Sequence, residues 1–127
     1  MAVQLNHTIV NVPDKVESAT FVAEILGLPA PVPFGPFLVV ELENGVSLDF
    51  SDSHGPVRHQ HYAFLVTESE FDEIFGRIRQ RGLTYWADPG RRRQGEINRN
   101  DGGRGVYWEE PGGHFLEIIT RPYGAGA

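Results

Sequence analysis

The sequence contains no cysteine among its 127 residues, so it has no disulfide framework and no thiolate metal site. Any metal that it binds must therefore be held by imidazole nitrogens and by oxygen ligands. The sequence also lacks a run of about 18 apolar residues that could span a bilayer, and its first ten residues lack the basic start of a secretory signal. We expect a soluble, cytoplasmic protein.

Basic residues are scarce as well. Eleven Lys and Arg face 17 Asp and Glu, and the net charge of −6 argues against nucleic acid as a partner. Five of the 11 basic residues nevertheless fall within one short stretch: Arg91, Arg92, Arg93, Arg99 and Arg104. Two interpretations stay open, a solvated loop or a mobile flap that attracts an anionic small molecule.

The length is that of one domain, residues 1–127, with enough chain for a core that needs no metal or disulfide. Residues 5–10 alternate apolar and polar side chains, which predicts a strand. Asp14 and Glu17 then form an aspartate version of the capping box, and Gly27 is a natural helix stop, so a helix is expected between them. After a proline-rich segment, two further strands flank the hairpin turn Asn44-Gly45.

The same order of elements begins again after a polar connector. Residues 59–66 alternate as a strand, and Thr67 with Glu70 is a capping box that opens a helix ending at Gly82. A short strand, a long loop over about 88–103 and a last hairpin follow. We therefore predict an α+β fold of two βαβββ modules, about 3–52 and 57–122, forming a curved mixed sheet around a central pocket with helices on the outer face.

The two modules place the same chemistry at matching points. Each has a histidine in its first strand, His7 or His61, and an acid four residues after the glycine of its last hairpin, Asp49 or Glu117. Glu117 stands alone in an apolar strand, where a carboxylate is costly to bury without a base, a hydrogen-bond donor or a metal ion. Two imidazoles and one carboxylate form the set that suits Fe(II), Mn(II), Zn(II) or Ni(II).

Other residues remain open from spacing alone. His59 shares a predicted strand face with His61, so either could be the ligand. Tyr107 lies opposite Glu117 if residues 111–113 form a three-residue hairpin loop, whereas a two-residue loop would place Trp108 there. Tyr107 is then either a core aromatic or a phenol that contacts the substrate.

Four stretches that span nearly the whole chain carry a family pattern: residues 5–9 (Leu-Asn-His-Thr-Ile), 61–66 (His-Tyr-Ala-Phe-Leu-Val), 105–108 (Gly-Val-Tyr-Trp) and 111–117 (Pro-Gly-Gly-His-Phe-Leu-Glu). In these stretches the chain resembles the vicinal oxygen chelate superfamily, which includes glyoxalase I, extradiol dioxygenases, fosfomycin-resistance thiol transferases and bleomycin-resistance proteins.

The resemblance implies roles for individual residues. It assigns the metal ligands to His7, His61 and Glu117, and so chooses His61 over His59. Asp49 falls near the fourth ligand of glyoxalase I, and its shorter side chain suits contact with the substrate equally well. Tyr107 would line the pocket and take part in catalysis with Glu117, and His59 would serve as a further substrate-binding or acid/base histidine.

The implied function is a metal-dependent enzyme that acts on an oxygen-rich small molecule by bidentate chelation, as a dioxygenase, a glyoxalase-type lyase or isomerase, or a thiol transferase. The alternative is a non-catalytic protein that sequesters an antibiotic, as bleomycin-resistance proteins do. The resemblance also implies a homodimer, often with one chain's module completing the other's pocket. Neither nucleic acid nor a membrane is expected as a partner.

Overall fold

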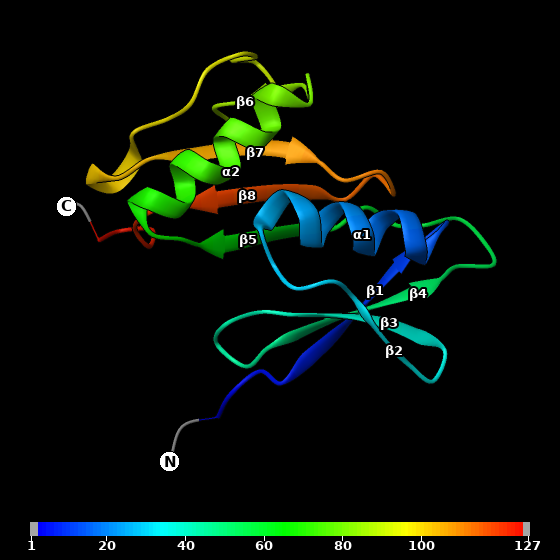
Figure 1. Cartoon of the computed structure of the whole chain (residues 1–127). Coiled ribbons are helices and arrows are strands. Elements are labelled where there is room, and N and C mark those ends of the chain that lie inside the picture. The colour runs from blue at the N-terminus through cyan, green and yellow to red at the C-terminus, as the bar shows by residue number, and fades with distance from the viewer. Residues whose placement is uncertain (1–2, 126–127) are drawn as a thin grey trace. The chain divides into compact units, whose positions relative to one another are not determined.

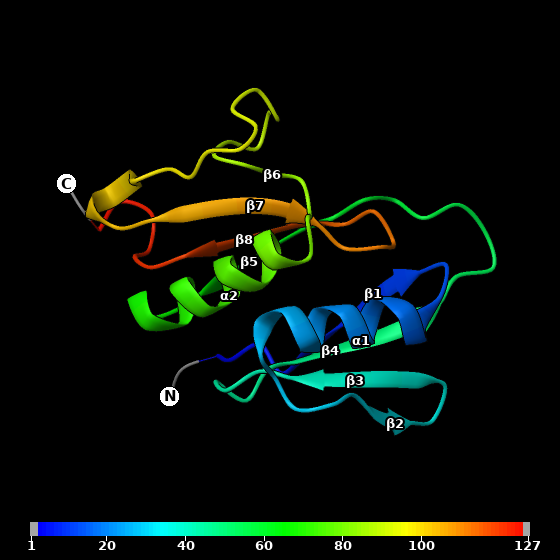
Figure 2. The same ribbon diagram turned by 45° about the horizontal axis from the view of Figure 1, so that its top comes forward.

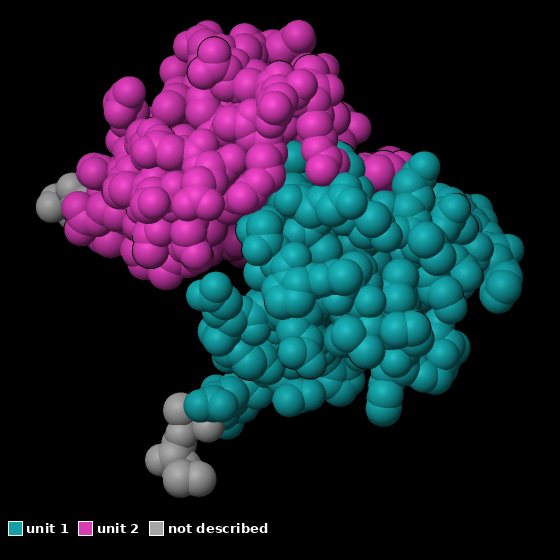
Figure 3. Space-filling view, viewed as in Figure 1, with its two compact units in different colours: residues 1–58 teal, residues 59–127 magenta. Residues whose placement is uncertain are grey.

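The computed structural model describes residues 3–125, and the chain divides into two compact units, residues 1–58 and residues 59–127 (Figure 3). Each unit is described by itself. Among residues 3–125 no helix is long and apolar enough to cross a membrane.

Unit 1 is a four-stranded mixed sheet with one helix (Figure 1). Its elements in chain order are β1 (His7–Val12), α1 (Lys15–Leu26), β2 (Val32–Phe34), β3 (Phe37–Glu41) and β4 (Ser47–Asp52). The strand order is β1-β4-β3-β2, in which β1 and β4 are parallel and the other pairs are antiparallel. The helix α1 packs on β1, β3 and β4 (Figure 2).

Unit 2 repeats this plan. Its elements are β5 (His61–Leu65), α2 (Glu68–Gln80), β6 (Tyr85–Trp86), a short 3₁₀ turn η1 (Asn100–Gly102), β7 (Gly105–Glu109) and β8 (Phe115–Ile119). The strand order is β5-β8-β7-β6, with β5 and β8 parallel. The first and last strands therefore lie side by side in both units.

The helix boundaries follow from the capping residues. Asp14 accepts hydrogen bonds from the amides of Val16 and Glu17, and α1 ends at Gly27, whose φ of 70° is the left-handed conformation. Thr67 and Glu70 form a complete reciprocal capping box at the start of α2. Both helices thus begin at the predicted caps.

Each helix covers one face of its own sheet. In unit 1 the buried side chains of α1 include Ala19, Val22 and Ile25. Val10 of β1 and Phe50 of β4 are also buried. In unit 2, Tyr85 of β6 packs edge-on against Phe75 of α2, with ring centroids 5.1 Å apart. We call the opposite face of each sheet, which the helix of its own unit does not cover, the open face.

The α+β class and the two βαβββ modules are confirmed, with the strands divided between two four-stranded sheets. Some strand boundaries differ from the predictions. β1 starts at His7 rather than at residue 5, and β5 starts at His61 rather than at His59. In α1, Val16 is 59% exposed and Ile25 is fully buried.

Candidate metal centre

Glu117 lies in the middle of β8 and is fully buried. Alternation along the strand directs Leu116 and Ile118 to the helix side and Glu117 to the open face, as predicted. A buried carboxylate is stable only where its oxygens have partners. The residues around Glu117 supply them for both oxygens.

The first partner is His61 on the neighbouring strand β5. In the register of β5 and β8, Ala63 pairs with Glu117, so His61 lies two residues away on the same face. Its Nε2 atom is 2.9 Å from Glu117 Oε1. Two of the predicted metal ligands therefore meet within unit 2.

The contact made by Nδ1 of His61 indicates whether the His61–Glu117 pair can bind a metal ion. Nδ1 is 3.1 Å from the backbone carbonyl oxygen of Phe115, which can only accept a hydrogen bond. Nε2 faces a carboxylate oxygen, which is also an acceptor. In the tautomer with hydrogen on Nδ1, Nε2 and Oε1 are two acceptors that a cation could share. A histidine whose Nδ1–H donates to a backbone carbonyl is the usual arrangement for an Nε2 metal ligand, so the pair fits a divalent metal.

Tyr107 of β7 faces Glu117 across the β7–β8 pair. The loop 111–113 has three residues, and Gly113 has a left-handed φ of 98°. Of the two loop lengths considered from the sequence, this is the one that places Tyr107, and not Trp108, opposite Glu117. The Tyr107 ring stacks on His61, with centroids 5.7 Å apart. Burial raises the pKa of the Tyr107 phenol, and its hydrogen bond with Tyr123 and the negative charge of Glu117 raise it further. The phenol is thus kept protonated.

Sequence reasoning missed Tyr123. Its hydroxyl donates to Glu117 Oε2 at 2.5 Å and lies 3.2 Å from the Tyr107 hydroxyl. Burial raises the pKa of Tyr123, and its hydrogen bond to Glu117 also raises it. Tyr123 lies in the turn after β8, where the Pro-Tyr-Gly sequence indicates only a turn. No sequence pattern linked it to the strand.

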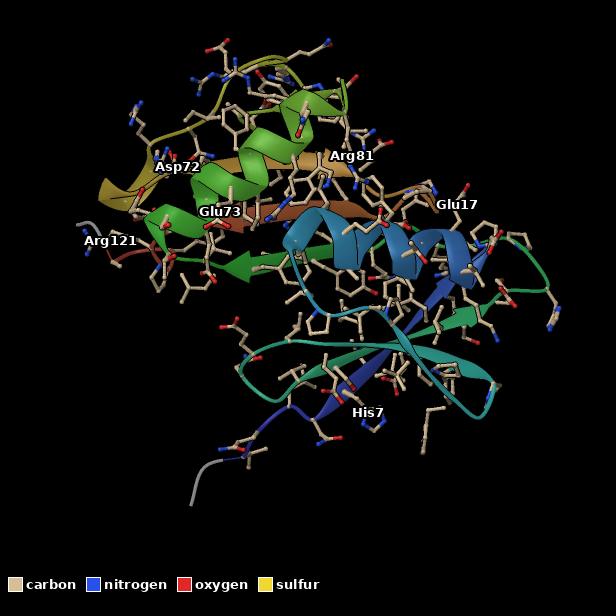
Figure 4. The ribbon with its side chains drawn as sticks, in the orientation of Figure 1. His7, Glu17, Asp72, Glu73, Arg81 and Arg121 are labelled. Atoms are coloured by element: carbon tan, nitrogen blue, oxygen red, sulfur yellow. The ribbon has the colours of Figure 1, made fainter. Side chains whose placement is uncertain are left out.

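His7 and Asp49 lie on the open face of the sheet in unit 1. The β1–β4 register pairs His7 with Ser47 and Ile9 with Asp49, so these side chains share one face. Figure 4 shows His7 on the side of the sheet away from α1. Asp49 is 8% exposed and accepts a hydrogen bond of 2.9 Å from the Ser47 hydroxyl.

A pocket of about 400 Å³ lies over this face. His7, Ser47 and Asp49 form its polar side, with Asn6 and Glu41. Side chains of β2 and β3 form its apolar side: Val32, Pro33, Phe34, Phe37 and Val39. The pocket can hold an apolar ligand body while polar groups of the ligand bind His7 and Asp49.

His59 lies outside the cluster around Glu117. It precedes β5, and its ring meets His114 edge-on with centroids 6.4 Å apart. His114 in turn packs edge-on against Tyr62, which alternates with His61 and so lies on the other face of β5. The predicted shared face of His59 and His61 is therefore wrong, because the alternation rule applies only where the strand continues.

The predicted ligand set is divided between the units, with His61 and Glu117 in unit 2 and His7 in unit 1. Within neither unit, as far as residues 3–125 are described, do three or more His, Asp or Glu residues form a group that could hold a metal ion. The set of three ligands stays a prediction.

Two arginines of the long loop form ion pairs. Arg91 lies 2.6 Å from Glu109, and its guanidinium covers the rings of Phe115 and Trp86 at 4.5 Å and 5.3 Å. Arg93 pairs with Glu96 at 3.3 Å. The cationic side chain of Arg91 is therefore paired beside the aromatic cluster that includes Tyr107 and His61.

Comparison with known proteins identifies the family. A sequence profile of the Glyoxalase/Bleomycin resistance protein/Dioxygenase superfamily matches residues 4–118. The chain belongs to this superfamily. The match to the superfamily covers most of both units and all of the predicted ligands.

Two kinds of relative stand out within the superfamily. The chain is 32% identical over 124 residues to the glutathione transferase FosA of Serratia marcescens, which covers 93% of this chain and 81% of FosA. Among solved structures, oxidase ChaP-H1 is 72% identical with a TM-score of 0.95 and covers 97% of this chain and 99% of its own. Oxidase ChaP-H2 is 66% identical with a TM-score of 0.96 and covers 100% of both chains.

More distant members share the fold alone. A lactoylglutathione lyase from Agrobacterium tumefaciens is 18% identical with a TM-score of 0.69, and it covers 93% of this chain and 93% of its own. The superfamily therefore accounts for the α+β fold, while the reaction must be argued from the residues of this chain.

Proposed function

We propose that this chain is a metal-dependent oxidase that acts on an oxygen-rich small molecule, which binds the metal through two oxygens. The observation that carries the proposal is the His61–Glu117 pair, in which Nε2 and Oε1 lie 2.9 Å apart and Nδ1 faces a carbonyl. Identities of 72% and 66% to proteins named oxidases favour oxidation over the other reactions of the superfamily.

The proposed metal ligands are His7, His61 and Glu117. They would hold a redox-active divalent ion such as Fe or Mn, which would supply the redox chemistry for oxidation of the substrate by dioxygen. The protein's own contribution is to fix the positions of the three ligand side chains. It also shields Glu117, which is fully buried, from water.

Three further residues are proposed to act on the substrate. Tyr107 would contact the substrate through its phenol oxygen, which can accept a hydrogen bond from a substrate hydroxyl while its own hydrogen is donated to Tyr123. Asp49 would accept a hydrogen bond from a substrate hydroxyl in the pocket of unit 1. His59 remains a candidate for binding the outer part of the substrate. We also propose that the protein acts as a homodimer.

The test is the metal content of protein purified without chelator, measured by elemental analysis. We expect near-stoichiometric Fe or Mn in the wild type and its loss in His61→Ala and Glu117→Ala. His54→Ala is the matched control, because His54 is an exposed histidine in the segment between β4 and β5 and should not change the metal content. A wild type that stays metal-free after exposure to Fe(II), Mn(II), Ni(II) and Zn(II) would contradict the proposal and favour a sequestering protein.

Thiol transfer is the second candidate, supported by the 32% identity to FosA. The two candidates differ in their co-reactant. An oxidase consumes dioxygen, whereas a thiol transferase consumes glutathione and an epoxide. An oxygen electrode with catechol as a chelating probe, and thiol titration with glutathione and fosfomycin, would separate them on the same metal-loaded protein.

A further inference from the structure

The two oxygens of Glu117 have different partners. Oε1 faces His61 Nε2, while Oε2 accepts the hydroxyl of Tyr123 at 2.5 Å. A carboxylate only accepts hydrogen bonds, so the Tyr123 hydrogen must point at Oε2. The Tyr107 hydroxyl, 3.2 Å from that of Tyr123, then donates to the Tyr123 oxygen. The chain of hydroxyls ends on one defined oxygen of Glu117.

The turn after β8 holds Tyr123 in this position. The amide of Gly124 donates to Asp101 Oδ1 at 2.9 Å, which ties the turn to the 3₁₀ turn η1. Within the turn, the amide of Ala125 donates to the carbonyl of Pro122 at 3.1 Å, and the Arg121 guanidinium donates to the Ala125 carbonyl at 2.8 Å. Tyr123 is 62% exposed, but these hydrogen bonds of the residues before and after it restrain its position.

A carboxylate ligand can bind a metal through one oxygen or through both. The choice matters here, because binding through both oxygens would occupy a coordination position that a chelating substrate needs. Hydrogen bonds to a ligating carboxylate orient it and fix which oxygen faces the metal. In this chain the strongest such contact, a charge-assisted O–H···O hydrogen bond, is made by Tyr123 to Oε2.

We propose that Tyr123 is a positioning residue that restrains Glu117 Oε2 and so leaves Oε1, the oxygen beside His61, to bind the metal. This inference rests on the proposed function, since it needs a metal at Glu117. It goes beyond the ligand set, because it states that Tyr123, which lies outside the strands, determines which oxygen of Glu117 binds the metal. The hydrogen bond from the Gly124 amide to Asp101 restrains the turn that carries Tyr123.

The test compares Tyr123→Phe, which removes only the hydroxyl, with the wild-type holoprotein. We expect Tyr123→Phe to bind Mn(II) about 10- to 100-fold more weakly in competition with a chelator. We also expect a changed visible spectrum of the Co(II)-substituted protein, because the coordination of Glu117 changes. Tyr85→Phe is the matched control, since Tyr85 lies on the helix side of the sheet and packs on Phe75. It should keep the wild-type affinity and spectrum.

A second variant and a metal-free measurement complete the test. Asp101→Ala, which removes the acceptor of the Gly124 amide, should weaken Mn(II) binding in the same direction. In the metal-free protein, the short hydrogen bond should give a downfield proton resonance that Tyr123→Phe lacks. If the wild type binds metal and Tyr123→Phe matches it in affinity and spectrum, the role of Tyr123 is wrong and the proposed function stands. If the wild type binds no metal, the proposed function itself fails.

Discussion

Gly113 fixes which side chain of β7 faces Glu117. Its φ of 98° lies in the left-handed region, and a Cβ atom at this position would lie 2.6 Å from His59 Nε2. A residue other than glycine must therefore strain the backbone or displace the His59 ring. We predict that Gly113→Ala lowers the free energy of unfolding by about 1–2 kcal/mol, measured by urea denaturation.

Gly76 is the matched control for this substitution, and the opposite sign is expected. It lies within α2, it has an ordinary negative φ, and nothing lies within 4 Å of the position of an added Cβ atom. Alanine is favoured over glycine in a helix interior, so Gly76→Ala should stabilise the protein by about 0.5–1 kcal/mol. Equal destabilisation by both variants would show that Gly113 has no special conformational role.

Single residues also show what a sequence can reveal about this site. Glu117 was predictable because an acid in an apolar strand needs partners. The sequence narrowed the residue opposite it to Tyr107 or Trp108, and the loop length seen in the structure decides for Tyr107. Tyr123 was not predictable. Its contact with Glu117 depends on the path of the turn after β8 and on the Asp101 hydrogen bond, and neither has a periodic pattern.

At the scale of elements, Arg104 ties α2 to the start of β7. Its guanidinium donates to Glu68 Oε1 at 2.8 Å and to Asp72 Oδ1 at 2.9 Å, and it lies over the Phe71 ring. A hydrogen bond from Thr120, and then that from Arg104, hold the pKa of Glu68 below its ordinary value of 4.5. Ionised Glu68 therefore stabilises the packing of the helix on the sheet.

The sign of the pH dependence follows from this lowered pKa. The stabilisation from Glu68 is complete above about pH 4.5, where the carboxyl is ionised in both states, and is lost as the pH falls through the lower pKa of the folded protein. We predict that Glu68→Gln lowers the thermal midpoint at pH 7 and that the difference from the wild type shrinks in acid.

Glu73→Gln is the control for Glu68→Gln. Glu73 makes a long, exposed i,i+4 pair with Arg77, at 3.6 Å, and such pairs contribute little. Its thermal midpoint should stay near that of the wild type at both pH values. A Glu68→Gln variant whose deficit is the same in acid as at pH 7 would contradict the role of the Glu68 charge.

The helices were predicted more accurately than the strands and the loop. Asp14, Gly27 and Thr67 are local signals, because each caps a helix through backbone groups within a few residues. Strand ends depend on partners far along the chain, which is why β5 begins at His61 rather than at His59. The ion pair of Arg91 with Glu109 likewise joins residues that no local pattern relates.

At the scale of the whole molecule, the chain repeats one plan in two units, and the repeat was visible in the sequence. In each unit the first and last strands are parallel neighbours, so each first-strand histidine lies on the sheet face that bears the acid of the last strand. Duplication thus gives both units a histidine and an acid on an open face. In unit 2 these residues, His61 and Glu117, are in contact; in unit 1, His7 and Asp49 line one pocket.

The last prediction concerns the ligand that unit 1 supplies. His7→Ala should lose the metal as completely as His61→Ala, because a site held by His61 and Glu117 alone lacks its third protein ligand. Mixed dimers test whether the three ligands come from one chain or from two: if the proposed homodimer shares its sites between chains, mixed dimers of His7→Ala and His61→Ala chains regain metal. Each mixed dimer would then join an intact His7 from one chain to an intact His61 and Glu117 from the other. Elemental analysis of doubly tagged, purified mixed dimers measures this, and dimers that stay metal-free would place all three ligands within one chain.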